Sequence, residues 1–269
     1  MWVLCLNLLR GRGYSLEKRA PMKSVSRRPA GPLCAAALVL QGIGTTAEAE
    51  GRWSGQIAAT SDYVLRGVSQ TDGHIAVQGS LAYRALSGVY AGAWASSLDR
   101  TDWYYPAGTA GLEIDLFAGY GRRLADNWSV DARATGYLYP EDGDFADYAY
   151  VEFESALLYR DVVRMSVAWS PDVSLVTRQG LVEDRQSLAL DIAARAPLLP
   201  WLSFVAGIGF RDIDGASPGG YAYWNAGLST QRGSLSIDLG LYGTDGNGRE
   251  LFGSDSAGSR TAVSVAWAF

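Results

Sequence analysis

Charged residues two positions apart are the first candidates for chemistry in this 269-residue chain. Three such pairs are Glu113 with Asp115, Asp131 with Arg133, and Glu152 with Glu154. This spacing puts both side chains of a pair on the same face of a β-strand. Two neighbouring carboxylates can act as general acid and general base. The same residues can equally line a polar interior, and nothing in the sequence marks Glu113 and Asp115 as catalytic.

The full set of candidate binding residues follows from the alternation of polar and apolar positions. We expect these side chains to face a lumen: Asp62, Arg66, Glu113, Asp115, Asp131, Arg133, Glu152, Glu154, Arg164, Asp191, Arg195 and Asp238. Charges of both signs on one wall would create a transverse field and a constriction that sorts solutes by charge and size. The alternative is that the charges pair across the lumen and plug a narrow barrel.

Hydrolytic chemistry would have to use His74, the only histidine, with Asp72 and Ser69 close to it in sequence. A hydroxyl nucleophile usually needs a nearby base, and membrane-facing hydrolases do place triads at a rim. A single histidine beside a glycine-containing loop is more often an ordinary loop residue. We therefore expect neither enzymatic activity nor a cofactor.

Two acidic loops, at residues 141–144 and 245–248, place oxygen ligands close together. Such ligands suit Ca²⁺, but neither loop has the full pattern of a dedicated site. A solvated turn is the simpler interpretation, so we predict no metal site. The alternative is a weak Ca²⁺ contact that links these loops to lipopolysaccharide.

The elements that position these charges are predicted to be strands. Leu112, Ile114 and Leu116 alternate with Glu113 and Asp115, and this period of two recurs along the chain. We predict twelve such segments, at residues 53–66, 74–84, 88–97, 111–122, 127–139, 147–158, 163–171, 186–196, 201–211, 221–230, 233–242 and 261–269. After Glu50 there is no amphipathic helical pattern and no apolar run long enough to span a membrane as a helix.

The connections between these segments alternate in length. Those after even-numbered segments are short, whereas those after odd-numbered segments, such as 98–110, 172–185 and 243–260, are generally longer and rich in turn-forming residues. An even strand number with alternating short and long connections is typical of an outer-membrane barrel. We predict an all-β fold, a transmembrane antiparallel up-and-down β-barrel of about twelve strands. A closed barrel satisfies every backbone hydrogen bond in hydrocarbon and has no free edge.

The first segment offers a check on strand length. Trp53 and Tyr63 are ten residues apart on the same predicted face. At about 3.3 Å per residue and a tilt near 40°, they would stand roughly 25 Å apart along the membrane normal. We therefore expect one of them in each interfacial aromatic belt.

The first 49 residues differ from the rest of the chain. A basic segment from Met22, an apolar run at residues 32–44 and small residues at Ala47 and Ala49 predict a secretory signal peptide with cleavage after Ala49. Residues 1–21 fit no part of such a signal, so we expect translation to start at Met22. The predicted exported part, residues 50–269, is one barrel domain.

The exported part is predicted to be acidic and free of cysteine, because Cys5 and Cys34 both precede residue 50. Seven of the 23 Lys and Arg and two of the 28 Asp and Glu also precede it, which leaves 16 basic and 26 acidic residues and a net charge of −10. This charge argues against a nucleic-acid partner.

The chain ends on apolar residues at alternate positions, Val263, Val265, Trp267 and Phe269. We expect this segment to pair with segment 53–66 and close the barrel. Its ending also resembles the C-terminal signal by which the barrel assembly machinery recognises outer-membrane proteins. The alternative is a buried edge strand of a periplasmic β-sandwich.

Residues 60–83, TSDYVLRGVSQTDGHIAVQGSLAY, and residues 87–96, SGVYAGAWAS, carry a family resemblance. They resemble the TorF family of proteobacterial outer-membrane porins. The positions that match are Thr60, Ser61, Asp62, Tyr63, Arg66, Gly67, Ser69, Gln70 and Gly73. The rest of the chain agrees in strand rhythm and in its aromatic end. The resemblance implies a barrel with channel function and names no substrate.

Two functions are consistent with these features. The first is an outer-membrane channel for passive diffusion of small polar or charged solutes. The second is a structural or adhesive barrel with a plugged lumen, whose contacts are carried by the loop at residues 243–260; a lipid-modifying enzyme at the rim is a weaker third. In each case we expect outer-membrane lipid and lipopolysaccharide as surroundings.

Overall fold

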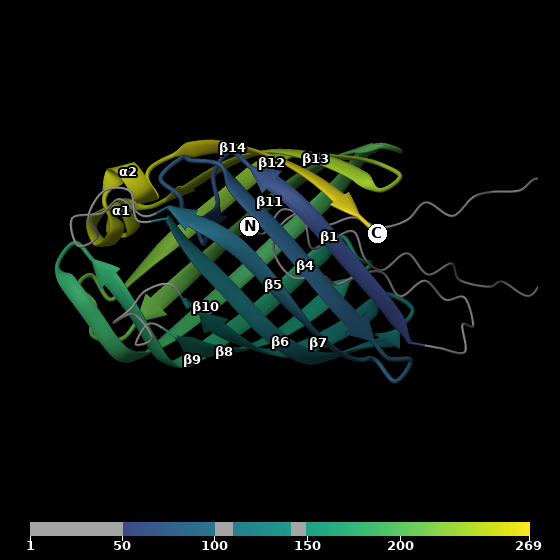
Figure 1. The fold of residues 1–269 in the computed structure, drawn as a ribbon, viewed down its shortest axis with the longest axis horizontal. Helices are drawn as coiled ribbons and strands as arrows, with labels where there is room; N and C mark the ends of the chain where they lie inside the picture. Colours follow the sequence, from purple (N-terminus) through teal and green to yellow (C-terminus); the bar gives the residue numbers. More distant parts are fainter. Residues whose placement is uncertain (1–50, 100–109, 141–148) are drawn as a thin grey trace, which may run out of the picture.

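The computed structural model describes residues 51–99, 110–140 and 149–269, and within them twelve strands form a closed antiparallel barrel (Figure 1). The barrel strands are β1 (Arg52–Thr60), β4 (Ala76–Arg84), β5 (Val89–Asp99), β6 (Ala110–Ala125), β7 (Trp128–Leu138), β8 (Tyr150–Tyr159), β9 (Val163–Thr177), β10 (Gly180–Leu199), β11 (Leu202–Ile213), β12 (Gly220–Arg232), β13 (Leu235–Thr244) and β14 (Arg260–Ala268). The remaining elements are β2 (Val64–Leu65), β3 (Val68–Ser69), α1 (Gly246–Phe252) and α2 (Ser254–Ala257). The predicted signal peptide and start lie outside the described residues.

The barrel closes between its first and last strands, as the sequence predicts. Ile57 in β1 is paired with Trp267 in β14. The amide of Phe269 donates to the carbonyl of Gly55, and the amide of Gly55 donates to the carbonyl of Phe269, both at 2.9 Å. The same β1 pairs with β4 on its other side. Both edges of the sheet are thereby satisfied by the protein itself.

The two faces of the wall have the predicted alternation. On β6, Leu116 is 52% exposed on the outer face while its neighbour Asp115 is 1% exposed on the inner face. An outer surface of this kind suits hydrocarbon, and the inner surface suits polar groups. Among the described residues, no helix has the length and apolar character needed to cross a membrane.

The two ends of the barrel differ. The end that carries Phe269, called here the turn end, has the short connections 85–88, 126–127, 160–162, 200–201 and 233–234. The opposite end is called the loop end and carries α1 and α2 (Figure 1). The predicted loop at 172–185 is wrong. There β9 and β10 continue as a long hairpin, with Thr177 paired with Gly180.

The first predicted segment, 53–66, is too long, because β1 ends at Thr60. The chain then turns into the barrel, and β2 and β3 form a two-stranded hairpin (residues 61–75 are called the inlet). Tyr63 is only 1% exposed, so its expected place in an outer aromatic belt is wrong. Trp53 does face outward, at 64% exposure, and its ring lies 5.2 Å from that of Tyr83.

The acidic loop at 245–248 begins helix α1. Asp245 is the N-cap of this helix, and its carboxylate accepts a hydrogen bond from the amide of Gly248 at 3.0 Å. The other acidic loop, 141–144, lies outside the described residues. Within the described ranges, no three His, Cys, Asp or Glu residues are grouped so that they could hold a metal ion.

Candidate functional site

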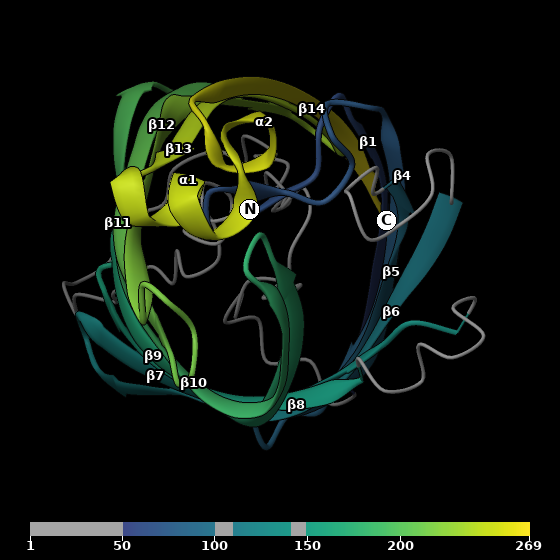
Figure 2. The same cartoon turned by 90° about the vertical axis from the view of Figure 1, so that its left-hand side faces the viewer.

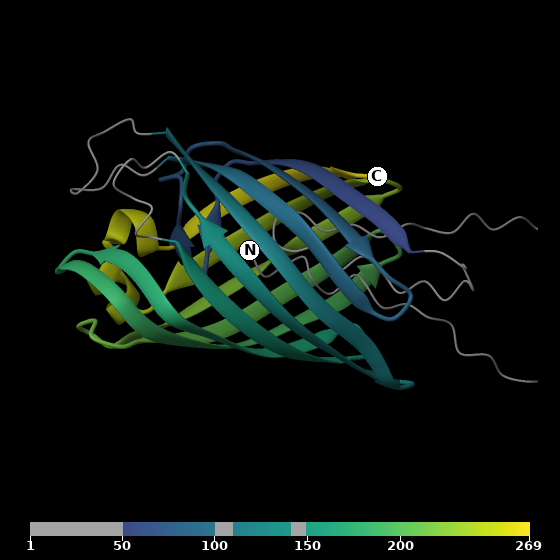
Figure 3. The same cartoon turned by 60° about the horizontal axis from the view of Figure 1, so that its bottom comes forward.

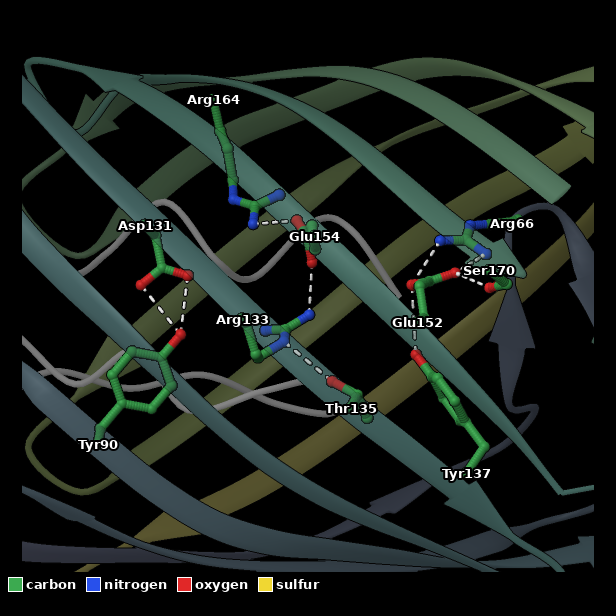
Figure 4. Close-up of polar contacts among 10 residues, drawn as sticks. All are labelled: Arg66, Tyr90, Asp131, Arg133, Thr135, Tyr137, Glu152, Glu154, Arg164 and Ser170. Atoms are coloured by element: carbon green, nitrogen blue, oxygen red, sulfur yellow. Dashed lines mark hydrogen bonds and ion pairs between the residues drawn. The ribbon is translucent and has the colours of Figure 1, made fainter. Parts of the chain in front are cut away.

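The interior contains a charged network along neighbouring strands β7, β8 and β9 (Figure 4). Glu154 in β8 accepts hydrogen bonds from Arg133 in β7 and Arg164 in β9. Arg133 and Glu154 are direct cross-strand partners, and Arg133 also donates to the Thr135 hydroxyl at 3.2 Å. Because these ion pairs join adjacent strands, they lie along the wall instead of bridging the lumen.

A second network reaches across the barrel. Arg66, at the turn of the inlet hairpin, meets Glu152 in β8 through Nη1 to Oε2 at 2.8 Å and Nη2 to Oε1 at 2.9 Å. The next residue, Gly67, has a φ of 81°, and a Cβ on it would lie 2.8 Å from the carbonyl oxygen of Gly243 in β13. Strands β8 and β13 stand five places apart in the ring of twelve, so the hairpin spans the interior.

Further contacts anchor the first residues of the inlet. Asp62 accepts a hydrogen bond from Arg260 at 2.6 Å and others from Ser69 and Thr71. Tyr63 donates to Glu113 in β6 at 3.2 Å. Charged side chains on β6, β8 and β14 thus hold the inlet in a fixed position inside the barrel.

The same arrangement of tyrosine, glycine and aspartate occurs twice. Tyr90 in β5 donates to Asp131 in β7 at 2.8 Å, passing over Gly119 of β6. Tyr223 in β12 likewise donates to Asp191 in β10, passing over Gly209 of β11. A Cβ on Gly119 would lie 2.5 Å from the Tyr90 ring, and one on Gly209 would lie 2.3 Å from the Tyr223 ring. Only glycine leaves room for each tyrosine to reach the second strand along.

The wall opposite the charged network carries no charge at its middle. Strands β14, β1 and β4 face β8, β9 and β10 in the ring (Figure 2). Their buried inward side chains are small or neutral: Gln56, Ala58, Thr60, Gln78, Ala262 and Ala266. The interior therefore has one wall with charges of both signs and one uncharged wall.

Eleven of the twelve predicted lining residues have buried side chains, and Arg195 in β10 is half-buried. The structure groups Arg66 with Glu152, and Arg133 with Glu154 and Arg164. Asp62 and Arg66 do not lie on β1 as expected, because the chain has already turned into the inlet. A role of these residues in solute binding stays a prediction.

The sequence analysis missed the inward tyrosines and Arg211. Tyr90, Tyr137 and Tyr223 bond to interior carboxylates, and Arg211 is only 8% exposed. Their signal was available, since each stands at an inward position of a predicted strand. The prediction of lumen-lining residues included only charged side chains at these positions, and it did not include Arg211, the last residue of the predicted segment 201–211.

The residues considered for hydrolysis do not form a hydrogen-bonded triad. His74 contacts Asp99 through Nδ1 at 2.9 Å, at the exposed loop end. Ser69 donates instead to Asp62, and Asp72 accepts from Ser256 in α2 at 3.1 Å. The three side chains thus have separate partners.

Comparison with known proteins gives a family and a fold. A family model described as a bacterial protein of unknown function (Gcw_chp) matches residues 45–269. No curated protein matches the chain in sequence. The resemblance of residues 60–96 to the TorF family stays a prediction.

Solved structures of outer-membrane channels share the fold. An outer-membrane channel from Pseudomonas putida F1 aligns with a TM-score of 0.50 and 11% identity, over 82% of this chain and 96% of that one. The NanC porin aligns at 0.48 and 8%, over 81% and 99%. The KdgM porin aligns at 0.46 and 10%, over 80% and 99%. At these identities the likeness concerns the fold alone.

Proposed function

Since this chain belongs to the Gcw_chp family of bacterial proteins of unknown function, we propose its function from the geometry of the barrel. It is a porin-like channel of the bacterial outer membrane, through which small polar or charged solutes diffuse passively. The observation that carries the proposal is the two-sided interior, with charges of both signs on β6 to β9 and, on β14, β1 and β4, a wall that is uncharged at its middle.

This arrangement suits selection by charge. Arg133, Glu154 and Arg164 are held in fixed positions by one another, so the field across the interior is preorganised. The inlet crosses the same interior, so solutes pass beside it and close to the Arg66–Glu152 pair. Fixed opposite charges in a narrow passage orient a dipolar or charged solute and restrict its size.

The arrangement of the ion pairs favours a channel over a plug. In the described part of the chain, Glu154 pairs only with arginines on adjacent strands of one wall. The inlet has its own ion pairs with the barrel wall, from Arg66 to Glu152 near the start of β8 and from Asp62 to Arg260 at the start of β14. Apart from the contacts of the inlet, these ion pairs therefore lie along the wall and do not bridge the lumen.

The test is single-channel recording in planar bilayers with the folded exported protein. We expect stepwise conductance in KCl and a reversal potential in asymmetric salt that reports the ion preference. The matched variant Glu154→Gln leaves the two arginines in place and is expected to shift that reversal potential toward anion preference. Folded protein that inserts without any current steps would contradict the proposal.

A closed structural or adhesive barrel is the second candidate, and one observation favours it. At the loop end, Leu251 of α1 and Ala257 of α2 are fully buried in a cluster with Val68 of the inlet and Tyr221 of β12. This candidate predicts no conductance from the intact protein. Deleting residues 246–257 then separates the two: a channel keeps its current, whereas a barrel closed by these helices gains one.

We also propose that β14 presents the recognition signal for barrel assembly. Its outward side chains Val263, Val265 and Trp267 and the terminal Phe269 are all exposed on the barrel surface, at 42%, 42%, 51% and 68%. Removing Phe269 is expected to lower the amount of folded barrel in the outer membrane, measured by heat-modifiable gel mobility in cells. The purified variant should still refold in detergent.

A further inference from the structure

A cavity of about 140 Å³ opens at the loop end, above the inlet hairpin. Its lining brings together four elements: Val68 of the inlet, Val173 of β9, Phe252 of α1, and Tyr221 of β12. Arg211 and Tyr150 also line it. In Figure 3, α1 and the long β9–β10 hairpin, which both contribute to this lining, lie together at the loop end.

Arg211 is the unusual group in this cavity. Its side chain is buried at 8% exposure, its Nε donates to the Ser187 hydroxyl at 2.9 Å, and it lines the same cavity as the Tyr221 phenol. Among the described residues, the buried or half-buried Arg66, Arg133, Arg164 and Arg260 each pair with a carboxylate. The hydrogen-bond partner of Arg211 there is instead a neutral hydroxyl, that of Ser187.

A buried positive charge with neutral partners is costly unless an anion joins it. Among the residues that the structure describes, the cavity lining includes one carboxylate, that of Asp72, which accepts a hydrogen bond from Ser256 of α2. The same lining includes a second arginine, Arg178, which is exposed at the rim. The described lining therefore has an excess of positive charge, and one of its two arginines is buried.

The remaining lining sets the shape of the occupant. Tyr150 is held by a stacked contact with Tyr137, with ring centroids 4.4 Å apart and planes inclined by 11°. Tyr221 is fixed by an edge contact with Phe252 at 5.4 Å. A cavity of about 150 Å³ accepts a benzene molecule, so this one has room for a single six-membered ring.

We propose that this cavity binds a small carboxylate that carries one ring. The carboxylate pairs with the guanidinium of Arg211, whose planar fork suits a two-point contact, and the ring lies among the tyrosines. The proposal rests on the channel function above and deepens it, because the site lies at the loop-end entrance, next to the inlet. It would concentrate such solutes before they pass the inlet.

The test is binding of benzoate and of glucuronate to the folded exported protein in nanodiscs, measured by ligand-observed NMR. Their neutral counterparts, benzamide and glucose, are measured in parallel. We expect at least one of the two anions to bind at least tenfold more tightly than its neutral counterpart. Binding of benzoate alone identifies an aromatic acid, and binding of glucuronate alone identifies a sugar acid.

Variants tie the binding to Arg211. Arg211→Gln is expected to weaken binding at least tenfold, and Arg211→Lys, which keeps the charge and loses the fork, to weaken it less. Arg122→Gln, the same change at an exposed position of β6, should leave binding unchanged. Gel mobility before and after heating verifies that each variant is folded.

Three outcomes overturn the proposal: no binding of either anion, equal binding of the neutral counterparts, or unchanged binding in folded Arg211→Gln. This binding measurement needs no current. Conductance without anion binding rejects the site and keeps the channel, whereas anion binding without conductance rejects the channel and keeps the site.

Discussion

Arg66 and Glu152 form a two-point ion pair, with contacts of 2.8 and 2.9 Å, although the hairpin that carries Arg66 enters the barrel from β1 and Glu152 belongs to β8. Both side chains are 5% exposed. Glu152 also lies 3.5 Å from the Tyr137 and Ser170 hydroxyls, which orient its carboxylate. The pair therefore fixes how far the inlet reaches across the interior.

Breaking this pair should widen the passage. Arg66→Ala frees the inlet from β8, so we expect single-channel conductance to rise about twofold or more. Arg66→Lys keeps one charge contact and should give an intermediate value. Unchanged conductance in folded Arg66→Ala would show that the hairpin does not limit the current.

Removing only the carboxylate should lower stability instead. Glu152→Gln leaves the Arg66 guanidinium buried without its charge partner, which is expected to lower the free energy of unfolding by about 3–5 kcal/mol. The double variant Arg66→Met with Glu152→Gln should recover much of this loss. Urea unfolding of the bilayer-inserted protein measures both, and equal losses in the single and double variants would refute the explanation.

A methyl group on Gly119 should disrupt the Tyr90–Asp131 contact. The added Cβ would lie 2.5 Å from the Tyr90 ring, and overpacking of this kind costs about 1–3 kcal/mol. Gly136→Ala in β7 is the matched control, because its nearest contact would be 4.0 Å away. Equal unfolding free energies for the two variants would argue against the close approach.

A charged residue introduced on the apolar outer face of the barrel should lower stability if that face contacts hydrocarbon. Leu239 lies in the middle of β13 on the outer face and is 45% exposed. Leu239→Arg is expected to cost about 2–4 kcal/mol in a bilayer, whereas Leu86→Arg in the turn 85–88 should cost about 0–1 kcal/mol. Equal unfolding free energies for the two variants would show that the outer face around Leu239 does not contact lipid.

Asp161, in the turn between β8 and β9, should make stability depend on pH. Partial burial raises the pKa of Asp161 to about 6, and Arg123, 3.9 Å away, only partly opposes this. The folded state thus holds the proton more tightly than the unfolded chain, so stability falls as the pH rises from about 4 to about 6 and stays lower above that.

Asp161→Asn removes this penalty and keeps a residue type that tolerates the φ of 57°. We expect a gain of less than about 1 kcal/mol above pH 7, because the site is partly solvated, and no gain near pH 3. Asp126→Asn, at an exposed position of another turn-end connection, is the control. A gain that is the same at both pH values would rule out titration of Asp161.

The barrel could be predicted from the sequence because each residue of the wall faces either the apolar exterior or the polar interior. Leu116 and Asp115 alternate for this reason, and such alternation located all twelve strands. The signal fails where the inner face meets protein instead. Leu175 and Val182 of the β9–β10 hairpin pack against the cluster around Leu251, so the polar half of the pattern disappears and the hairpin resembles a loop.

The inlet and the partners of the interior charges could not be predicted from the sequence. The sequence around Arg66 has no signal which indicates that this residue adopts a φ of 49° and that the chain turns inward. The inward position of Glu152 and Glu154 follows from alternation. The partner of each one depends on strand register and, for Arg66, on a segment that leaves the wall altogether.

The two tyrosines that reach over glycine tie together strands that are not neighbours. A displacement of β5 along β6 by two residues would keep every side chain on its correct face, yet in one direction it would set Tyr90 opposite Phe117 instead of Gly119. The same displacement between β11 and β12 would set Tyr223 opposite Gly207 or Arg211 and separate it from Asp191. These contacts therefore help to specify the strand register. They destabilise registers shifted by two residues, which the alternation of apolar and polar residues alone would allow.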